Sequence, residues 1–123
     1  MSPTRAFAFR YGVFRLLLSA LGLGPAFSRV ELADDTVTVR MGWAFRATIP
    51  RARITGCEAR TGLVGGIGVH GWRGRWLVNG AATGLVTITV EPPVQAWVVV
   101  PVHLSQLTVS LEDPDAFRSA LGA

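Results

Sequence analysis

Apolar and polar residues alternate through most of residues 28–111 with a period of two, which is the period of a β-strand. A half-buried strand of an antiparallel sheet has this pattern, because one face packs on the core and the other meets water. The chain is therefore predicted to be mainly β. The alternation is clearest in residues 28–32, 37–41, 43–49 and 85–90.

Turn-forming residues divide this region into strands. The pair Asp34-Asp35 predicts a turn, because aspartate side chains hydrogen-bond their own backbone and tolerate tight conformations. Gly42 interrupts the next alternation and predicts a hairpin. Its first arm covers residues 37–41, and Trp43 begins the apolar face of its second arm. Both arms are expected to be apolar on the inside and polar on the outside.

The second half of the chain shows further strands and stronger breaks. Asn-Gly at residues 79–80 predicts a tight turn, because both residue types accept positive φ. Glu-Pro-Pro at residues 91–93 predicts a break, since proline cannot donate a hydrogen bond to a strand ladder. Residues 97–100 form an unbroken apolar run before Pro101. We expect an antiparallel barrel or strongly bent sheet of about seven strands. The strands of this half are expected at residues 54–60, 75–79, 85–90 and 107–111.

The N-terminal segment has two interpretations. Phe7, Phe9 and Tyr11 alternate with smaller or polar residues, which predicts a strand, and residues 13–21 could form two helical turns that end at glycine. Alternatively, arginines followed by the apolar residues 16–23 resemble a secretory signal. Neither interpretation includes a transmembrane helix, because the apolar run is shorter than the roughly 20 residues that one needs.

The C-terminal segment predicts a short helix over about residues 114–121. Asp113 can cap the helix, and Pro114 suits its first position, where the missing N–H is not needed. Phe117 and Leu121 lie four residues apart on one face and can pack on the sheet. The expected organisation is one domain, with an N-terminal extension (1–25), an antiparallel β core (28–111) and a capping helix (113–121).

Composition excludes some classes of protein. Half of the 123 residues are hydrophobic and only 16% are charged, which excludes a disordered chain. The single cysteine, Cys57, cannot form an internal disulfide, and this favours a reduced, cytoplasmic setting. The alternatives are a location peripheral to the membrane and secretion through an N-terminal signal.

All twelve basic residues are arginine, and the formal net charge is +4. A guanidinium group binds phosphate or carboxylate in a bidentate manner, so arginine suits anionic partners. The arginines are nevertheless spread along the chain, with no run of four. This distribution favours a solvated surface of mixed charge, and the absence of lysine fits the codon usage of a GC-rich genome.

Residues 61–84 hold eight of the fourteen glycines and most of the candidate chemistry. Glycine lets a backbone approach a ligand closely. If this part is extended, Arg73 and Arg75 share a face and could hold a phosphate or carboxylate. The candidate ligand-binding residues are therefore His70, Trp72, Arg73 and Arg75. The alternative is that Trp76 is core, the arginines are solvated, and the apolar residues 63–69 pack on a partner or on the domain itself.

Enzyme and cofactor motifs are missing from the sequence. No Gly-x-Ser-x-Gly motif occurs, and no Gly-Lys-Ser/Thr follows the glycines. His70 and His103 are the only histidines, and neither has the neighbours expected of a metal ligand. We expect no catalytic residues, no metal and no cofactor.

The order of elements over residues 28–121, short antiparallel strands followed by one helix, resembles a bacterial pleckstrin-homology-like (PH-like) barrel. The stretches GVHGWRGRWLVNG and LTVSLEDPDAF also resemble an uncharacterised family of small proteins from GC-rich bacteria. The first resemblance implies a helix that plugs a barrel and a binding function. Basic loops between early strands of PH-like barrels often bind phosphoinositide headgroups, but the Gly-rich loop here lies mid-chain.

The sequence thus favours a non-enzymatic binding or interaction module that uses residues 61–80. Its expected partner is another protein, a second copy of the chain or an anionic lipid headgroup. One alternative is a small ligand-binding or enzymatic pocket around His70. Another is nucleic-acid binding through the dispersed arginines and tryptophans.

Overall fold

The computed structural model describes residues 4–12, 15–60 and 68–122. The fold is mainly β, with one sheet and a short C-terminal helix, as the sequence predicts. The elements are β1 (Arg5–Phe7), α1 (Arg15–Ala20), β2 (Ser28–Leu32), β3 (Thr36–Met41), β4 (Phe45–Pro50), the 3₁₀ turn η1 (Arg51–Arg53), β5 (Ile54–Arg60), β6 (Gly68–Trp72), β7 (Arg75–Asn79), β8 (Leu85–Val98), β9 (Val100–Ser110) and α2 (Pro114–Ala120).

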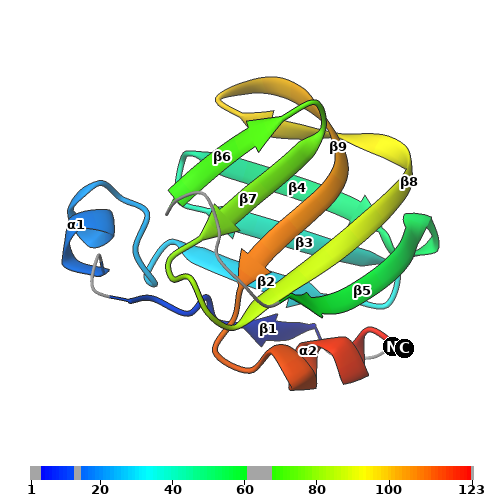
Figure 1. Cartoon of the computed structure of the whole chain (residues 1–123), viewed down its shortest axis with the longest axis horizontal. Coiled ribbons are helices and arrows are strands. Elements are labelled where there is room, and N and C mark those ends of the chain that lie inside the picture. Colours follow the sequence, from blue (N-terminus) through cyan, green and yellow to red (C-terminus); the bar gives the residue numbers. More distant parts are fainter. Residues whose placement is uncertain (1–3, 13–14, 61–67, 123) are drawn as a thin grey trace.

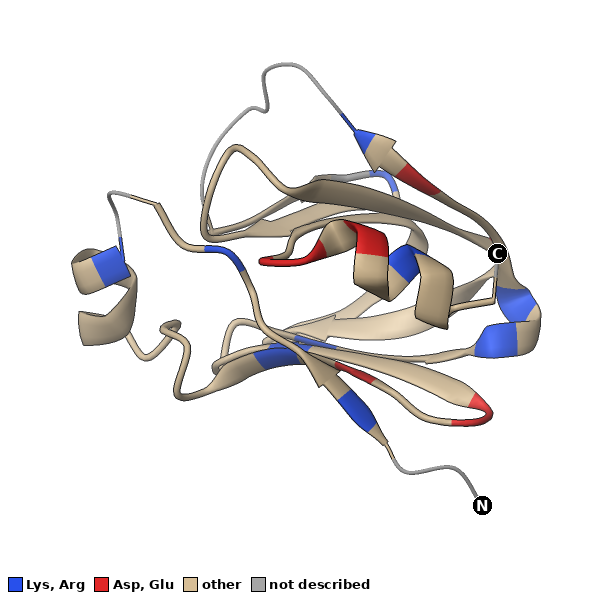
Figure 2. Ribbon diagram, turned by 90° about the horizontal axis from the view of Figure 1, so that it is seen from below, with Lys and Arg blue, Asp and Glu red and all other residues tan. Residues whose placement is uncertain are grey.

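The described strands form a nine-stranded sheet in the order β1-β2-β3-β4-β8-β9-β7-β6, and β5 also pairs with β8. The sheet is not closed, and it folds over so that β2–β4 lie opposite β6, β7 and β9 (Figures 1 and 2). It has more strands than the predicted seven, because the N-terminal segment and β6 join it. The strands pair in the antiparallel sense, as predicted, except β7 and β9, which are parallel.

β8 connects the two layers of the sheet. Its first half, residues 85–90, pairs with β5, and residues 96–97 near its end pair with β4. Its other edge pairs with β9, and this ladder shifts register between Thr89 and Val94. The predicted break at residues 91–93 was therefore wrong. The two prolines lie where β8 changes partner, so the strand continues through a gap in the ladder that proline can occupy.

The predicted tight turn at Asn79-Gly80 was also wrong. Neither residue has positive φ, and β7 does not pair with β8. Residues 80–84 instead cross the end of β9, where the Gly80 N–H donates to Ser110 Oγ at 2.9 Å and Asn79 Nδ2 donates to the Ala81 carbonyl at 2.8 Å. Asn79 and Gly80 therefore begin the connection from β7 to β8, which crosses the end of β9. The hydrogen bonds to Ala81 and Ser110 hold this connection in place.

The apolar run at residues 97–100 is the tip of the β8–β9 hairpin. Val98 pairs with Val100, and Val99 between them has φ of 66°. Positive φ is rare for a β-branched residue. Trp97, Val99 and Val100 are all exposed, so the run does not form a buried strand.

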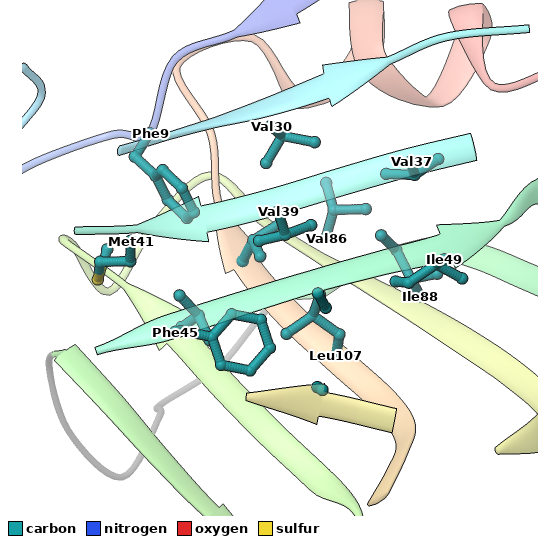
Figure 3. Packing of buried hydrophobic residues seen from close by; sticks show 14 of the residues in the cluster. Phe9, Val30, Val37, Val39, Met41, Phe45, Ile49, Val86, Ile88 and Leu107 are labelled. Carbon is teal, nitrogen blue, oxygen red and sulfur yellow. The ribbon is translucent and has the colours of Figure 1, made fainter. Parts of the chain in front are cut away.

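The core lies between the layers of the folded sheet (Figure 3). Side chains of β2–β4 meet those of β8 and β9 in one cluster. Alternate residues of β3 and β4 point into it, as the two-residue period predicts. The largest fully buried side chains include Phe9, Phe45, Phe117, Met41, Ile49, Ile88, Leu107 and Leu111.

The N-terminal segment belongs to the fold, which supports its structural interpretation. β1 pairs with β2, Phe9 bridges to Leu111, and Phe7 and Phe9 are buried. Tyr11 Oη donates to the Leu23 carbonyl at 2.6 Å. The short helix α1 follows within the predicted range. No helix among the described residues is long and apolar enough to cross a bilayer.

α2 forms as the sequence predicts and covers one opening of the folded sheet (Figure 2). Asp113 Oδ1 accepts a hydrogen bond from the Ala116 N–H at 3.1 Å, and Pro114 occupies the first turn. Phe117 is fully buried, and its ring meets the Phe7 ring edge to face at 5.2 Å between centroids. The two ends of the chain thus pack on each other through one aromatic pair.

This contact predicts that Phe117→Ala lowers the free energy of unfolding by about 3–5 kcal/mol, because the truncation leaves a cavity between α2 and β1. Urea unfolding followed by circular dichroism measures the change. Phe27→Ala is the control, since Phe27 is 59% exposed and its loss should change stability by about 0.5 kcal/mol or less. Equal stability of the two variants would contradict the packing.

Candidate functional site

All four predicted site residues lie on the β6–β7 hairpin. Trp72 ends β6 and pairs with Arg75, the first residue of β7. Arg73 and Gly74 form the two-residue turn between them, with φ of 51° and 85°. Both residues of a type I′ turn need positive φ. Arg73 and Arg75 would share a face only if the chain were extended through both residues, and this condition is not met, because the chain reverses between them.

His70 is exposed on β6, opposite Leu77. The neighbouring Gly71 pairs with Trp76, and a Cβ at Gly71 would overlap the Trp76 ring. Trp76 Nε1 also donates to the His103 carbonyl at 3.1 Å. Gly71 therefore makes room for a tryptophan that packs on the core, as the alternative interpretation of Trp76 expects. Residues 61–67 lie outside the described residues.

The tip of this hairpin is fixed to β9. The Gly74 carbonyl accepts hydrogen bonds from the Ser105 N–H at 2.8 Å, the Gln106 N–H at 3.1 Å and Ser105 Oγ at 3.1 Å. The Arg73-Gly74 turn is thus held by the sheet. Arg75 is exposed beside it.

A second group of arginine and tryptophan residues lies on the outer face of β2, β3, β4 and β8. The strand register places Arg29 opposite Arg40, Arg40 opposite Arg46, and Arg46 opposite Trp97. All four side chains point away from the core, because their neighbours along each strand are buried. The four residues form one row across four strands.

Trp43 lies beside this row, at the β3–β4 turn. The prediction that Trp43 begins the second strand of the hairpin was wrong. The β3–β4 ladder begins with the pair Met41 and Phe45, so Gly42, Trp43 and Ala44 form the turn. The indole is 64% exposed, and its Nε1 donates to the Leu21 carbonyl at 2.7 Å. This hydrogen bond joins the turn to the segment that follows α1.

Arg40, Arg46 and the two tryptophans surround a shallow depression of about 280 Å³, which Gly42 and Val99 also line. A neighbouring depression of about 380 Å³ extends from Arg40 past Arg29 to Phe27. Arg40 therefore lies between two hollows of one surface. We call the group Arg40, Trp43, Arg46 and Trp97 the Arg–Trp face.

The charge of this face is not balanced within the described part of the chain. Arg29 is paired with Glu31, at 2.6 Å between Nε and Oε1. No such carboxylate accompanies Arg40 or Arg46 among the described residues, although Arg40 Nε reaches the Gly42 carbonyl at 3.5 Å. The other acidic residues lie elsewhere, at the β2–β3 turn, on β5 and β8, and around the start of α2 (Figure 2). Like charges directly opposite each other in an antiparallel pair are destabilising, so the pair is suited to an anionic ligand.

The spacing of Arg40 and Arg46 in the sequence contains information about this pair, which a count of consecutive arginines does not detect. Arg40 and Arg46 lie at equal distances on either side of Trp43, and both fall on the polar side of the predicted alternation. A hairpin whose turn is centred on Trp43 places them opposite each other, whereas the predicted turn at Gly42 does not. Trp97 could not be added in the same way, because its pairing with β4 joins strands far apart in the sequence.

Cys57 lies in a different place, at a depression of about 240 Å³ formed by β5 and the end of α2. Burial raises the pKa of the Cys57 thiol, and the nearby Arg118 only partly opposes this effect. Because the thiolate is the nucleophilic form, a raised pKa makes this thiol less reactive. No group of three or more His, Cys, Asp or Glu side chains suited to a metal ion occurs within the described residues.

Comparisons of the chain with protein-family models, with curated proteins and with solved structures found no match.

We predict that iodoacetamide alkylates Cys57 more slowly in the folded protein than in the urea-unfolded chain at pH 8. The thiol stays protonated until the pH approaches its raised pKa, so the folded rate should rise at higher pH than the unfolded rate. Mass spectrometry of quenched samples measures both rates. A faster reaction in the folded state would mean that Cys57 is an activated nucleophile, and equal rates would mean that the fold does not change the reactivity of the thiol.

Proposed function

We propose that this protein is a non-enzymatic binding module that recognises an anionic partner through the Arg–Trp face. The observation that carries the proposal is the cross-strand pair Arg40–Arg46, which has no carboxylate partner in the described chain and lies between two exposed tryptophans. The Cys57 thiol does not favour an enzymatic alternative, because its raised pKa opposes nucleophilic chemistry.

The chemistry of the pair favours phosphate or carboxylate. Directly opposite residues of an antiparallel pair have Cβ atoms about 5 Å apart, so two guanidinium groups can converge on one anion. Each presents a planar fork of donors that matches the oxygens of such a group. A bound anion would also relieve the repulsion between Arg40 and Arg46, and the exposed indole rings can cover its less polar parts.

The β6–β7 hairpin remains a second place for the same activity. His70 and Arg75 are exposed there, but the described turn separates Arg73 from the strand face of Arg75. The resemblance to PH-like barrels and the choice between a protein partner and a lipid headgroup stay predictions. An experiment that compares the two surfaces decides which one binds.

Isothermal titration with sodium tripolyphosphate tests the proposal. We expect Arg40→Gln/Arg46→Gln to lower the affinity at least about tenfold, because each lost charge-assisted contact is worth roughly 1.5–3 kcal/mol. The affinity of the parent protein should fall as the salt concentration rises. Circular dichroism should show the variant folded, since both side chains are on the outer face.

Two double variants serve as matched controls, because each removes the same charge. Arg5→Gln/Arg60→Gln alters exposed arginines outside both surfaces and should bind nearly as the parent does. Arg73→Gln/Arg75→Gln alters the hairpin. Loss of binding only in the hairpin variant would move the site to residues 70–75, and equal loss in all three would show that net charge alone attracts the anion. Either result would contradict the proposal that the Arg–Trp face binds the anion.

A further inference from the structure

We propose that the Arg–Trp face and the apolar residues around it dock on the surface of an anionic lipid bilayer. This inference rests on the proposed function, since it names the source of the anion. The bilayer would supply phosphate groups to Arg40 and Arg46 and an apolar boundary to the leucines, valines and aromatic rings beside them.

The exposed large hydrophobic side chains of the described chain are not scattered. They come from three segments, which are α1 with the loop after it, the β3–β4 turn, and the tip of the β8–β9 hairpin. None comes from β5, β9 beyond its first residue, or α2. The set is Leu16, Leu17, Leu21, Phe27, Trp43, Trp97, Val99 and Val100, with exposed fractions from 41% to 85%.

These three segments lie next to one another. Trp43 Nε1 is bonded to the Leu21 carbonyl, which joins the turn to the end of α1. Trp43, Trp97 and Val99 line the same depression, which joins the turn to the hairpin tip. In Figure 1, α1 lies at the left and the β8–β9 tip at the top, and both are away from α2 at the bottom. We call this set of residues the apolar belt.

α1 exposes leucine side chains to solvent. Leu18 is buried and anchors the helix, whereas Leu16 is 85% exposed and Leu17 is 57% exposed. Arg15 is also exposed at the start of the same helix. Leucine and aromatic residues next to arginine are typical of surfaces that lie in a bilayer interface. A contiguous exposed apolar surface marks a place of interaction in a folded protein.

The positive charge of Arg40 and Arg46 favours an anionic bilayer over a second copy of the chain as the partner of the belt. In a two-fold contact, a residue of one copy meets a different residue of the other copy, so Arg40 and Arg46 would each need a carboxylate elsewhere on the same face of the partner copy. The carboxylates that could neutralise them lie outside the depressions next to the belt. An anionic membrane instead offers negative charge wherever the belt meets it. No helix in the described part of the chain could span a bilayer, so the contact proposed is peripheral.

Co-sedimentation with vesicles tests the inference. We expect the full-length protein to bind vesicles of equal parts phosphatidylcholine and phosphatidylglycerol and to remain in the supernatant with phosphatidylcholine alone. Leu16→Ser/Leu17→Ser should weaken binding to the anionic vesicles at least about tenfold, because two apolar side chains no longer enter the interface. The same variant should keep the parent's affinity for tripolyphosphate, since neither leucine lines the depression between Arg40 and Arg46.

Arg40→Gln/Arg46→Gln should lose both vesicle and tripolyphosphate binding, and Arg5→Gln/Arg60→Gln should keep both. A parent protein that binds tripolyphosphate but no vesicles would overturn the membrane inference and leave the proposed function standing. Vesicle binding that the leucine variant retains would also overturn it. Dimers in light scattering that the leucine variant abolishes, without vesicle binding, would assign the belt to a second copy.

Discussion

The backbone ladder of β8 is the interaction on which the rest of this structure depends. One edge of β8 is divided between β5 and β4, while the other edge pairs with β9. The layer that contains β2–β4 and the layer that contains β7 and β9 therefore meet along this strand. Residues 8–12, which follow β1, join the layers a second time through backbone hydrogen bonds such as that from the Arg10 N–H to the Ser110 carbonyl at 2.9 Å. Pro92 and Pro93 lie where the partner changes, so the residues without a backbone donor fall where continuous pairing is not required. The core forms because this strand brings the two apolar faces together.

Local signals in the sequence were sufficient for the elements that depend on neighbouring residues. The alternation in residues 37–41 and the cap at Asp113 each predict structure that the fold contains. Tertiary partners decided the remaining elements. Two consecutive prolines would end an isolated strand. β8 nevertheless continues past Pro92 and Pro93, because it pairs with β5 before them and with β4 after them. Asn79-Gly80 favours a hairpin, but here it begins a crossover over the end of β9.

The candidate site shows the same division between local and long-range information. Sequence reasoning selected residues 70–75 because glycine, arginine and tryptophan are close together there. The hairpin uses Gly71 to accommodate the Trp76 ring, and its turn separates Arg73 from Arg75. The Arg–Trp face draws Arg40 and Arg46 from one hairpin and Trp97 from a strand some fifty residues later. Proximity along the chain therefore selected the residues of the β6–β7 hairpin as the candidate site, whereas cross-strand register assembled the Arg–Trp face.

All basic residues of the chain are arginines, so guanidinium groups alone supply the positive charge of the Arg–Trp face. The chain contains no lysine, so acetylation of lysine, a common way to neutralise a basic surface, has no target on this one. Under the function proposed above, competition governs occupancy of the face, through ionic strength and the supply of dissolved phosphates and other anions. The protein has a constitutive cationic surface whose control lies in its surroundings.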